Sequence, residues 1–314
     1  MQAMEPTPEA LRNPLARYFL ATRPAFLIVT LVGALVGFAV AFASGVALSP
    51  AVATLAILLA LIAHAAVNVL NDYYDAVNGT DAINTERVFP FTGGSRFIQN
   101  GVLTMQETAR YGWALVGVVI VGGLVLTAWA GPGLVAIGLV GLLIGWAYSA
   151  PPLALNSRGL GELCVTAGFA LVVIGSDFVL RRAFAPEPIV AAISYGLLVA
   201  NILYINQFPD RKADEAAGKH HWVVRLGAER AVYGYYAIAI AAHGWIVLAV
   251  LAGRLPAVTL VALGSAPLAF QAARILRRFA AQPSELAPAL KLTIGTAVIH
   301  GVLLALALIA SRFV

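Results

Sequence analysis

Long uninterrupted runs of apolar residues dominate the chain, and polar residues gather between them. We count nine stretches near the roughly 20 residues that a helix needs to cross the hydrocarbon core of a bilayer. Because the runs are continuous rather than alternating, they favour helices over the strands of a transmembrane barrel. The predicted spans cover residues 25–43, 51–71, 113–130, 134–150, 161–180, 188–207, 231–252, 256–273 and 292–311.

The composition also indicates a membrane protein. The chain has 314 residues, of which 61% are hydrophobic and 11% are charged, whereas a soluble protein is about half apolar and about a quarter charged. We therefore expect an all-α polytopic membrane protein with about nine transmembrane helices around a central cavity. Residues 1–24 are expected to form a cytoplasmic or interfacial lead. Residues 25–314 are expected to form one transmembrane domain, built as two four-helix halves plus a last helix.

Positive charge is unevenly divided between the predicted loops. The N-terminal segment and every second loop carry 16 of the 20 Lys and Arg residues. The positive-inside rule then places the N-terminus in the cytoplasm and, after nine spans, the C-terminus outside. In a bacterium this would be the plasma or inner membrane. A nucleic-acid partner is not expected, because the basic residues are spread over short loops without a recognition motif.

The first of two acidic clusters lies at the end of the second predicted span. His64, Asn68, Asn71, Asp72 and Asp75 follow one another at spacings of one to four residues, and most of these spacings share one helical face. A polar stripe on a spanning helix points into a cavity, because lipid cannot satisfy it. Carboxylate and carboxamide oxygens suit Mg²⁺. The alternative is interhelical hydrogen bonding by Asn68 and helix capping by Asp75.

The long loop after this cluster holds further candidates. Asp81 is either another metal ligand or part of an Asx-turn or helix cap. The segment 93–95, Gly-Gly-Ser, can present backbone amides to a phosphate oxygen, or it is a plain flexible turn. Arg87 and Arg96 are placed to pair with phosphate or with anionic lipid.

The second acidic cluster lies at the end of the sixth predicted span. Asn206, Asp210 and Asp214 are spaced i, i+4, i+8, again on one helical face. Pro209 is expected to kink this helix or to start a new one. Lys219 follows closely, and a cation beside carboxylates fits a metal–diphosphate site. The alternative is a solvated loop with local ion pairs of little energetic value.

The two clusters are expected to face each other. They end spans that are four helices apart, so both helices enter the membrane in the same direction. A parallel repeat of four-helix units would place both clusters on a central cavity. The neighbouring His220 and His221 are interpreted as loop or interfacial histidines, because adjacent side chains rarely chelate one ion together.

The motifs Asn-Asp-x-x-Asp (71–75) and Asp-x-x-x-Asp (210–214), each at a span end, resemble the UbiA superfamily of intramembrane aromatic prenyltransferases. The resemblance covers most of the chain and includes residues 148–153, 159–162, 218–219 and 224–227. Within the superfamily the chain is most similar to the 1,4-dihydroxy-2-naphthoate branch of menaquinone synthesis. It departs from that branch at Gly79, at Gln207 to Pro209 and at His220 to Trp222.

The resemblance implies a UbiA-type fold and a function. Mg²⁺ held by Asp72, Asp75, Asp210 and Asp214 would bind a polyprenyl diphosphate, whose prenyl group passes to an aromatic acceptor. These four aspartates are the expected catalytic and metal-binding residues. The expected substrate-binding residues are Asn68, Asn71, Asp81, Arg87, Tyr148, Asn206 and Lys219.

Other functions stay open from the residues alone. Within the same family the acceptor can instead be 4-hydroxybenzoate, homogentisate, haem, chlorophyllide or a sugar phosphate. A cation-coupled transporter or a lipid-binding protein is possible, although broken helices in mid-span would then be expected. A CDP-alcohol phosphotransferase fits poorly, because the chain lacks the Asp-Gly-x-x-Ala-Arg run of that family.

Overall fold

The computed structural model describes residues 4–313, and every regular element in that range is helical. Eight segments there are long and apolar enough to cross a membrane. They are α2 (Leu27–Ala43, preceded by η1, Pro24–Phe26), α3 (Pro50–Val77), α5 (Met105–Ala130), α7 (Gly161–Arg181), α8 (Pro186–Ala216), α10 (Ala228–Leu251), the joined pair η3 (Ala257–Ser265) and α11 (Ala266–Phe279), and α12 (Ala287–Ala310). A further apolar helix, α6 (Gly133–Ser149), is shorter at 17 residues. The prediction of an all-helical membrane protein is confirmed.

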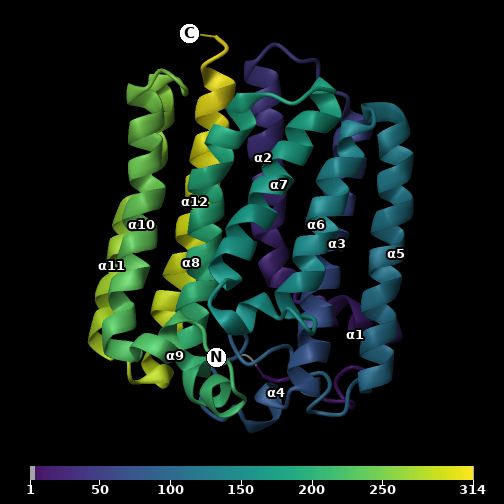
Figure 1. Cartoon of the computed structure of the whole chain (residues 1–314), viewed down its shortest axis with the longest axis vertical. Helices are drawn as coiled ribbons and strands as arrows, with labels where there is room; N and C mark the ends of the chain where they lie inside the picture. The colour runs from purple at the N-terminus through teal and green to yellow at the C-terminus, as the bar shows by residue number, and fades with distance from the viewer. Residues whose placement is uncertain (1–3, 314) are drawn as a thin grey trace.

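Short helices are inserted between the long ones. They are α1 (Pro14–Ala21), α4 (Thr80–Ile83), η2 (Leu155–Arg158), α9 (Trp222–Leu226) and η4 (Pro283–Glu285). Figure 1 shows α4 and α9 at the lower end of the bundle, with the C-terminus at the opposite end. Which end faces the cytoplasm, and the division into a lead and one domain, stay predictions.

The two helices that carry the acidic clusters are longer than a membrane is thick. α3 has 28 residues and α8 has 31, which at 1.5 Å per residue gives about 42 and 46 Å. The hydrocarbon core of a bilayer is about 30 Å thick, so an end of each helix projects beyond it. Both carboxyl-terminal ends lie together, because Asn84, shortly after α3, donates a hydrogen bond of 2.6 Å to Asp210 of α8. The expected parallel arrangement of the two helices is therefore present.

α8 excludes one of the two expectations for Pro209. The helix runs through Pro209 to Ala216, so no new helix begins at the proline. A proline inside a helix lacks the N–H that would bond to the carbonyl four residues earlier, here that of Ile205. Both residues are buried within α8. The span predicted at 188–207 was thus too short.

The bundle has an inner and an outer layer. In the most apolar part of α8, 72% of the residues are buried, against 11% in α5, which lies at the right edge of Figure 1. Around α8, helices α2, α7 and α12 contribute to one buried apolar cluster that includes Val36, Val173, Tyr195 and Leu304. The Tyr195 hydroxyl donates to the Val29 carbonyl of α2, which satisfies its polar atom inside the core.

The closest approach in this inner layer depends on Gly37 of α2. A Cβ atom there would overlap the Val173 carbonyl oxygen and would lie 2.7 Å from Ser176 Cβ, both on α7. Small residues at helix contacts let backbones come together, which supplies packing energy where lipid gives no hydrophobic drive.

Gly37→Ala is therefore expected to lower the free energy of unfolding by about 1–3 kcal/mol through overpacking. The midpoint of thermal unfolding in detergent measures this. Gly117→Ala on α5 is the matched control, because no atom lies within 4 Å of an added Cβ there. Equal midpoints for the two variants would contradict a close α2–α7 contact.

Candidate active site

Lys219 joins the two acidic clusters. Its ammonium nitrogen Nζ lies 2.9 Å from Asp75 Oδ1 on α3 and 2.9 Å from Asp214 Oδ1 on α8. Lys219 is buried, with 8% of its surface exposed. Burial opposes its charge, but attraction from Asp75 and Asp214 is stronger and raises the pKa of Lys219. The two acidic clusters therefore lie together as predicted, and the ammonium group of Lys219 bridges them.

The loop between α4 and α5 makes a second connection across the clusters. Asn84 Nδ2 donates to Asp210 Oδ1 at 2.6 Å, and the Gly93 amide donates to Asp210 Oδ2 at 3.3 Å. The Ser95 amide lies 3.3 Å from both Asp72 carboxylate oxygens. The backbone amides of segment 93–95 therefore point to carboxylates, which fixes the loop over the ends of α3 and α8.

Asp81 faces the same space. Asn78 caps this turn, accepting the Thr80 amide at 3.0 Å, which leaves the Asp81 side chain free for another role. Its Oδ2 is buried without a hydrogen-bond partner among residues 4–313. A Cβ added at Gly94 would overlap this Oδ2 and lie 3.0 Å from Asp72 Oδ1, so both carboxylates converge on Gly94. Of the two interpretations open from the sequence, the position fits a ligand better than a cap.

Burial and the neighbouring carboxylates disfavour the ionised form of Asp81. Burial first, and then the negative charges of Asp75, Asp72 and Asp210, raise the pKa of Asp81 to about 8. No three carboxylate, imidazole or thiolate groups within residues 4–313 form a complete metal site by themselves. Mg²⁺ commonly keeps waters and shares substrate phosphates. The aspartates therefore fit a magnesium ion whose other ligands are water and phosphate oxygens.

His221 lies in the loop before α9, in line with its interpretation as a loop histidine, and the structure adds a contact with Asp214 that the sequence did not predict. His221 Nε2 lies 3.0 Å from Asp214 Oδ2, and its Nδ1 accepts the Val224 amide at the start of α9. A neutral ring that accepts at Nδ1 carries its proton on Nε2, so His221 donates to the carboxylate. The apolar turn 222–226 is the sequence signal that indicates a short helix with His221 as its N-cap.

Three other predicted residues lie at or near α3. Asn71 donates to Asp75 Oδ2 at 3.2 Å and to Ser149 Oγ at 3.0 Å, and Tyr148 directly precedes this serine at the end of α6. Asn68 instead donates to the Thr22 carbonyl at 3.0 Å. This is the interhelical hydrogen bond that the sequence left open as an alternative.

Within residues 4–313, no hydrogen bond or salt bridge joins Asn206 or Arg87 to the aspartates. The Asn206 Oδ1 atom is buried with no hydrogen-bond partner among the described residues. Arg87 Nη2 lies 2.6 Å from Glu5 Oε1 in the N-terminal segment, so its guanidinium is already paired. A role of Arg87 at phosphate stays a prediction. Glu5 was not singled out in the sequence, because no local pattern links positions 82 residues apart.

Lys219→Met is expected to lower the free energy of unfolding by about 3–5 kcal/mol, because it leaves the buried Asp214 and the partly buried Asp75 without their cation. Chemical or thermal unfolding in detergent measures the loss. Lys212→Met is the matched control. The Lys212 side chain is 65% exposed and pairs with Glu86, and such pairs contribute about 1 kcal/mol or less. Similar losses in both variants would contradict the central position of Lys219.

Comparisons with known proteins identify the family of this chain. The model of the UbiA prenyltransferase family matches residues 27–295. The chain is 33% identical over 185 residues to the 1,4-dihydroxy-2-naphthoate octaprenyltransferase of Escherichia coli (strain K12), covering 57% of this chain and 58% of that protein. It is 30% identical over 244 residues to the enzyme of the same name from Mycobacterium leprae (strain TN), covering 76% and 78%.

A solved structure shares the fold. It is a UbiA homologue from Archaeoglobus fulgidus bound to DMAPP and Mg²⁺, with a TM-score of 0.64 and 20% identity, and the match covers 94% of this chain and 99% of that one. The family match spans most of the chain, and a relative at 30% identity covers three quarters of it. This chain therefore belongs to the UbiA prenyltransferase family.

Proposed function

We propose that this prenyltransferase moves a polyprenyl group from a polyprenyl diphosphate to 1,4-dihydroxy-2-naphthoate, with Mg²⁺ as its cofactor. Both relatives named above carry that acceptor in their names. The observation that supports the proposal best is the meeting of two acidic clusters at Lys219, since a diphosphate held through metal ions needs grouped carboxylates with a cation beside them.

The donor would bind through its diphosphate. Asp72, Asp75, Asp210 and Asp214 are the residues that would hold Mg²⁺, with Asp81 as a fifth candidate. When bound, the metal supplies Lewis-acid stabilisation of the negative charge on the departing diphosphate. Lys219 places an ammonium group between the clusters. This group would neutralise negative charge on the diphosphate that the metal does not balance.

The acceptor and the allylic carbon need a dry, electron-rich surrounding. Tyr148 precedes Ser149, which bonds to Asn71 of the first cluster. Tyr73 and Tyr74 lie on the same turn of α3, with ring centroids 5.1 Å apart. Aromatic ring faces attract positive charge, so these tyrosines are candidates to shield a cation-like prenyl group until the acceptor ring attacks it. An interfacial aromatic belt is their other possible role.

The test is an assay with purified protein, Mg²⁺, octaprenyl diphosphate and a panel of three acceptors, read by mass spectrometry. The expected product carries the prenyl group on the naphthalene ring and has lost the carboxyl group as CO2, with diphosphate released, and 4-hydroxybenzoate and homogentisate are expected to react poorly. A prenylated product from another acceptor alone would overturn the acceptor assignment and leave the family activity intact. Binding of the donor without turnover of any acceptor would favour a transporter or lipid-binding protein.

The carboxylates supply the loss-of-function variants for this assay. Asp72→Asn and Asp210→Asn are each expected to lower turnover by about 10²–10³-fold or more, because each removes charge that is needed in the transition state. Glu215→Gln is the matched control, since it neutralises an exposed carboxylate next to Asp214. Retained turnover in both aspartate variants would exclude the proposed diphosphate site.

Gly94→Ala is expected to abolish most of the prenyl transfer while the protein still folds. Gly94 has a φ of +72°, and the added Cβ would push into the space between Asp72 and Asp81. Gly101→Ala is the matched control for backbone strain. Gly101 has a φ of +69° in the same loop but no atom within 4 Å of an added Cβ. Equal turnover of the two variants would show that the carboxylate spacing at Gly94 is unimportant.

A further inference from the structure

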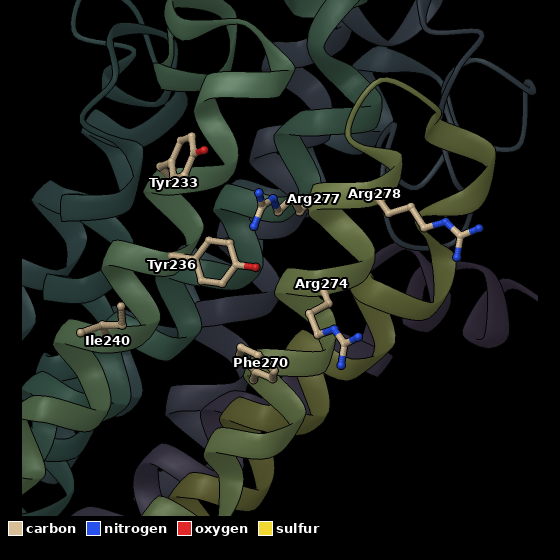
Figure 2. A pocket seen from close by; sticks show the side chains of 7 residues that line it. All are labelled: Tyr233, Tyr236, Ile240, Phe270, Arg274, Arg277 and Arg278. Carbon is tan, nitrogen blue, oxygen red and sulfur yellow. The ribbon is translucent and has the colours of Figure 1, made fainter.

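A pocket between α10 and α11 lies apart from the carboxylates. It has a volume of about 700 Å³ and is open along the outer face of the two helices, where Tyr233, Ile240 and Phe270 are exposed. Figure 2 shows Tyr233 and Tyr236 on one helix opposite Arg277 on the other. The lining residues are Tyr233, Tyr236, Ile240, Phe270, Arg274, Arg277 and Arg278. None of them belongs to the candidate active site.

The pocket changes from polar to apolar along its length. On α10 the lining runs from Tyr233 to Ile240, and on α11 it runs from Arg277 back to Phe270 (Figure 2). Seven residues on a helix cover about 10 Å. The basic end lies toward the beginning of α10 and the end of α11, which is the lower end of the bundle in Figure 1. The apolar end lies deeper in the membrane-spanning part.

The basic end has positive charge that no carboxylate pairs with among residues 4–313, although Arg274 and Arg278 lie over the rings of Phe270 and Phe279. Among residues 4–313, none of Arg274, Arg277 and Arg278 forms a salt bridge. A smaller hollow of about 360 Å³ adjoins the pocket and shares Tyr233, Arg277 and Arg278 with it. Glu229 is the one carboxylate among the residues that line the two hollows. Three guanidinium groups against one carboxylate leave an anion-attracting site at the membrane edge.

We propose that this pocket binds an anionic phospholipid. The phosphodiester headgroup would lie at the arginines and one acyl chain would lie along Ile240 and Phe270. Arginine recognises phosphate through paired N–H donors, and basic pockets between membrane helices on the cytoplasmic side are suited to anionic headgroups. A prenyl diphosphate is a poorer occupant, because the lining contains no pair of aspartates to hold the Mg²⁺ that such a donor carries.

Native mass spectrometry of the delipidated full-length protein tests the proposal. Titration with dioctanoyl phosphatidylglycerol is expected to give one saturable adduct, and dioctanoyl phosphatidylcholine is expected to bind much more weakly. The double variant Arg277→Gln/Arg278→Gln is expected to bind phosphatidylglycerol about thirtyfold more weakly, at about 1 kcal/mol per arginine near a lipid surface. Arg230→Gln is the matched control, because Arg230 is exposed on α10 at the same end but lines neither hollow.

Two competition experiments test whether the pocket prefers a phospholipid to other molecules that carry phosphate. Millimolar inorganic phosphate is expected to leave the phosphatidylglycerol adduct in place, and its displacement would mean a free-phosphate site instead. Octaprenyl diphosphate with Mg²⁺ is expected to leave it in place as well, and its displacement would assign the pocket to the donor substrate. Equal binding of both phospholipids, or unchanged binding in the double variant, would overturn the proposal. Because the readout is lipid binding, it is independent of the acceptor assigned above.

Discussion

The cost of keeping carboxylates away from water is the constraint on which this structure depends. Asp72 and Asp214 are buried near the ends of the apolar helices α3 and α8, and Asp81 is buried on the short helix α4 beside them, where an unpaired charge is expensive. The protein offsets this cost locally, with the Lys219 ammonium, the Ser95 amide and the His221 ring. These partners come from two loops, the one between α4 and α5 and the one between α8 and α9, so the loops at this end of the bundle are organised around the aspartates.

The same constraint explains why α3 and α8 are so long. A helix of about 20 residues only crosses the hydrocarbon core. Aspartates within such a helix would lie in apolar surroundings. By continuing beyond the hydrocarbon core, each helix carries its acidic residues to the membrane edge. There the connecting loops can reach them with polar groups. The bundle thus gives a rigid frame, and the loops supply the neutralising contacts.

Much of this arrangement could be predicted from the sequence, because it depends on helical periodicity. The i, i+4 spacing of Asp210 and Asp214 places both on one face whatever the loops do, and apolar run length fixes the spans. Contacts between distant loops follow no such rule. The partners of Asp210 and Asp214, namely Asn84 and His221, are set by how the chain closes between helices. The pairing of Arg87 with Glu5 was missed for the same reason.

The pair of Arg87 and Glu5 ties the N-terminal segment to the loop over the aspartates. Glu5 contacts Arg87, Arg96 and Asn100, so residues ahead of the first span hold down the loop that covers the aspartates. The Glu5 side chain is 28% exposed, and ion pairs in contact with water weaken as salt is added. Ionic strength therefore weakens the Glu5–Arg87 ion pair more than the buried ion pair of Lys219 and Asp214. The access of charged substrates and the stability of the bundle can respond to salt separately.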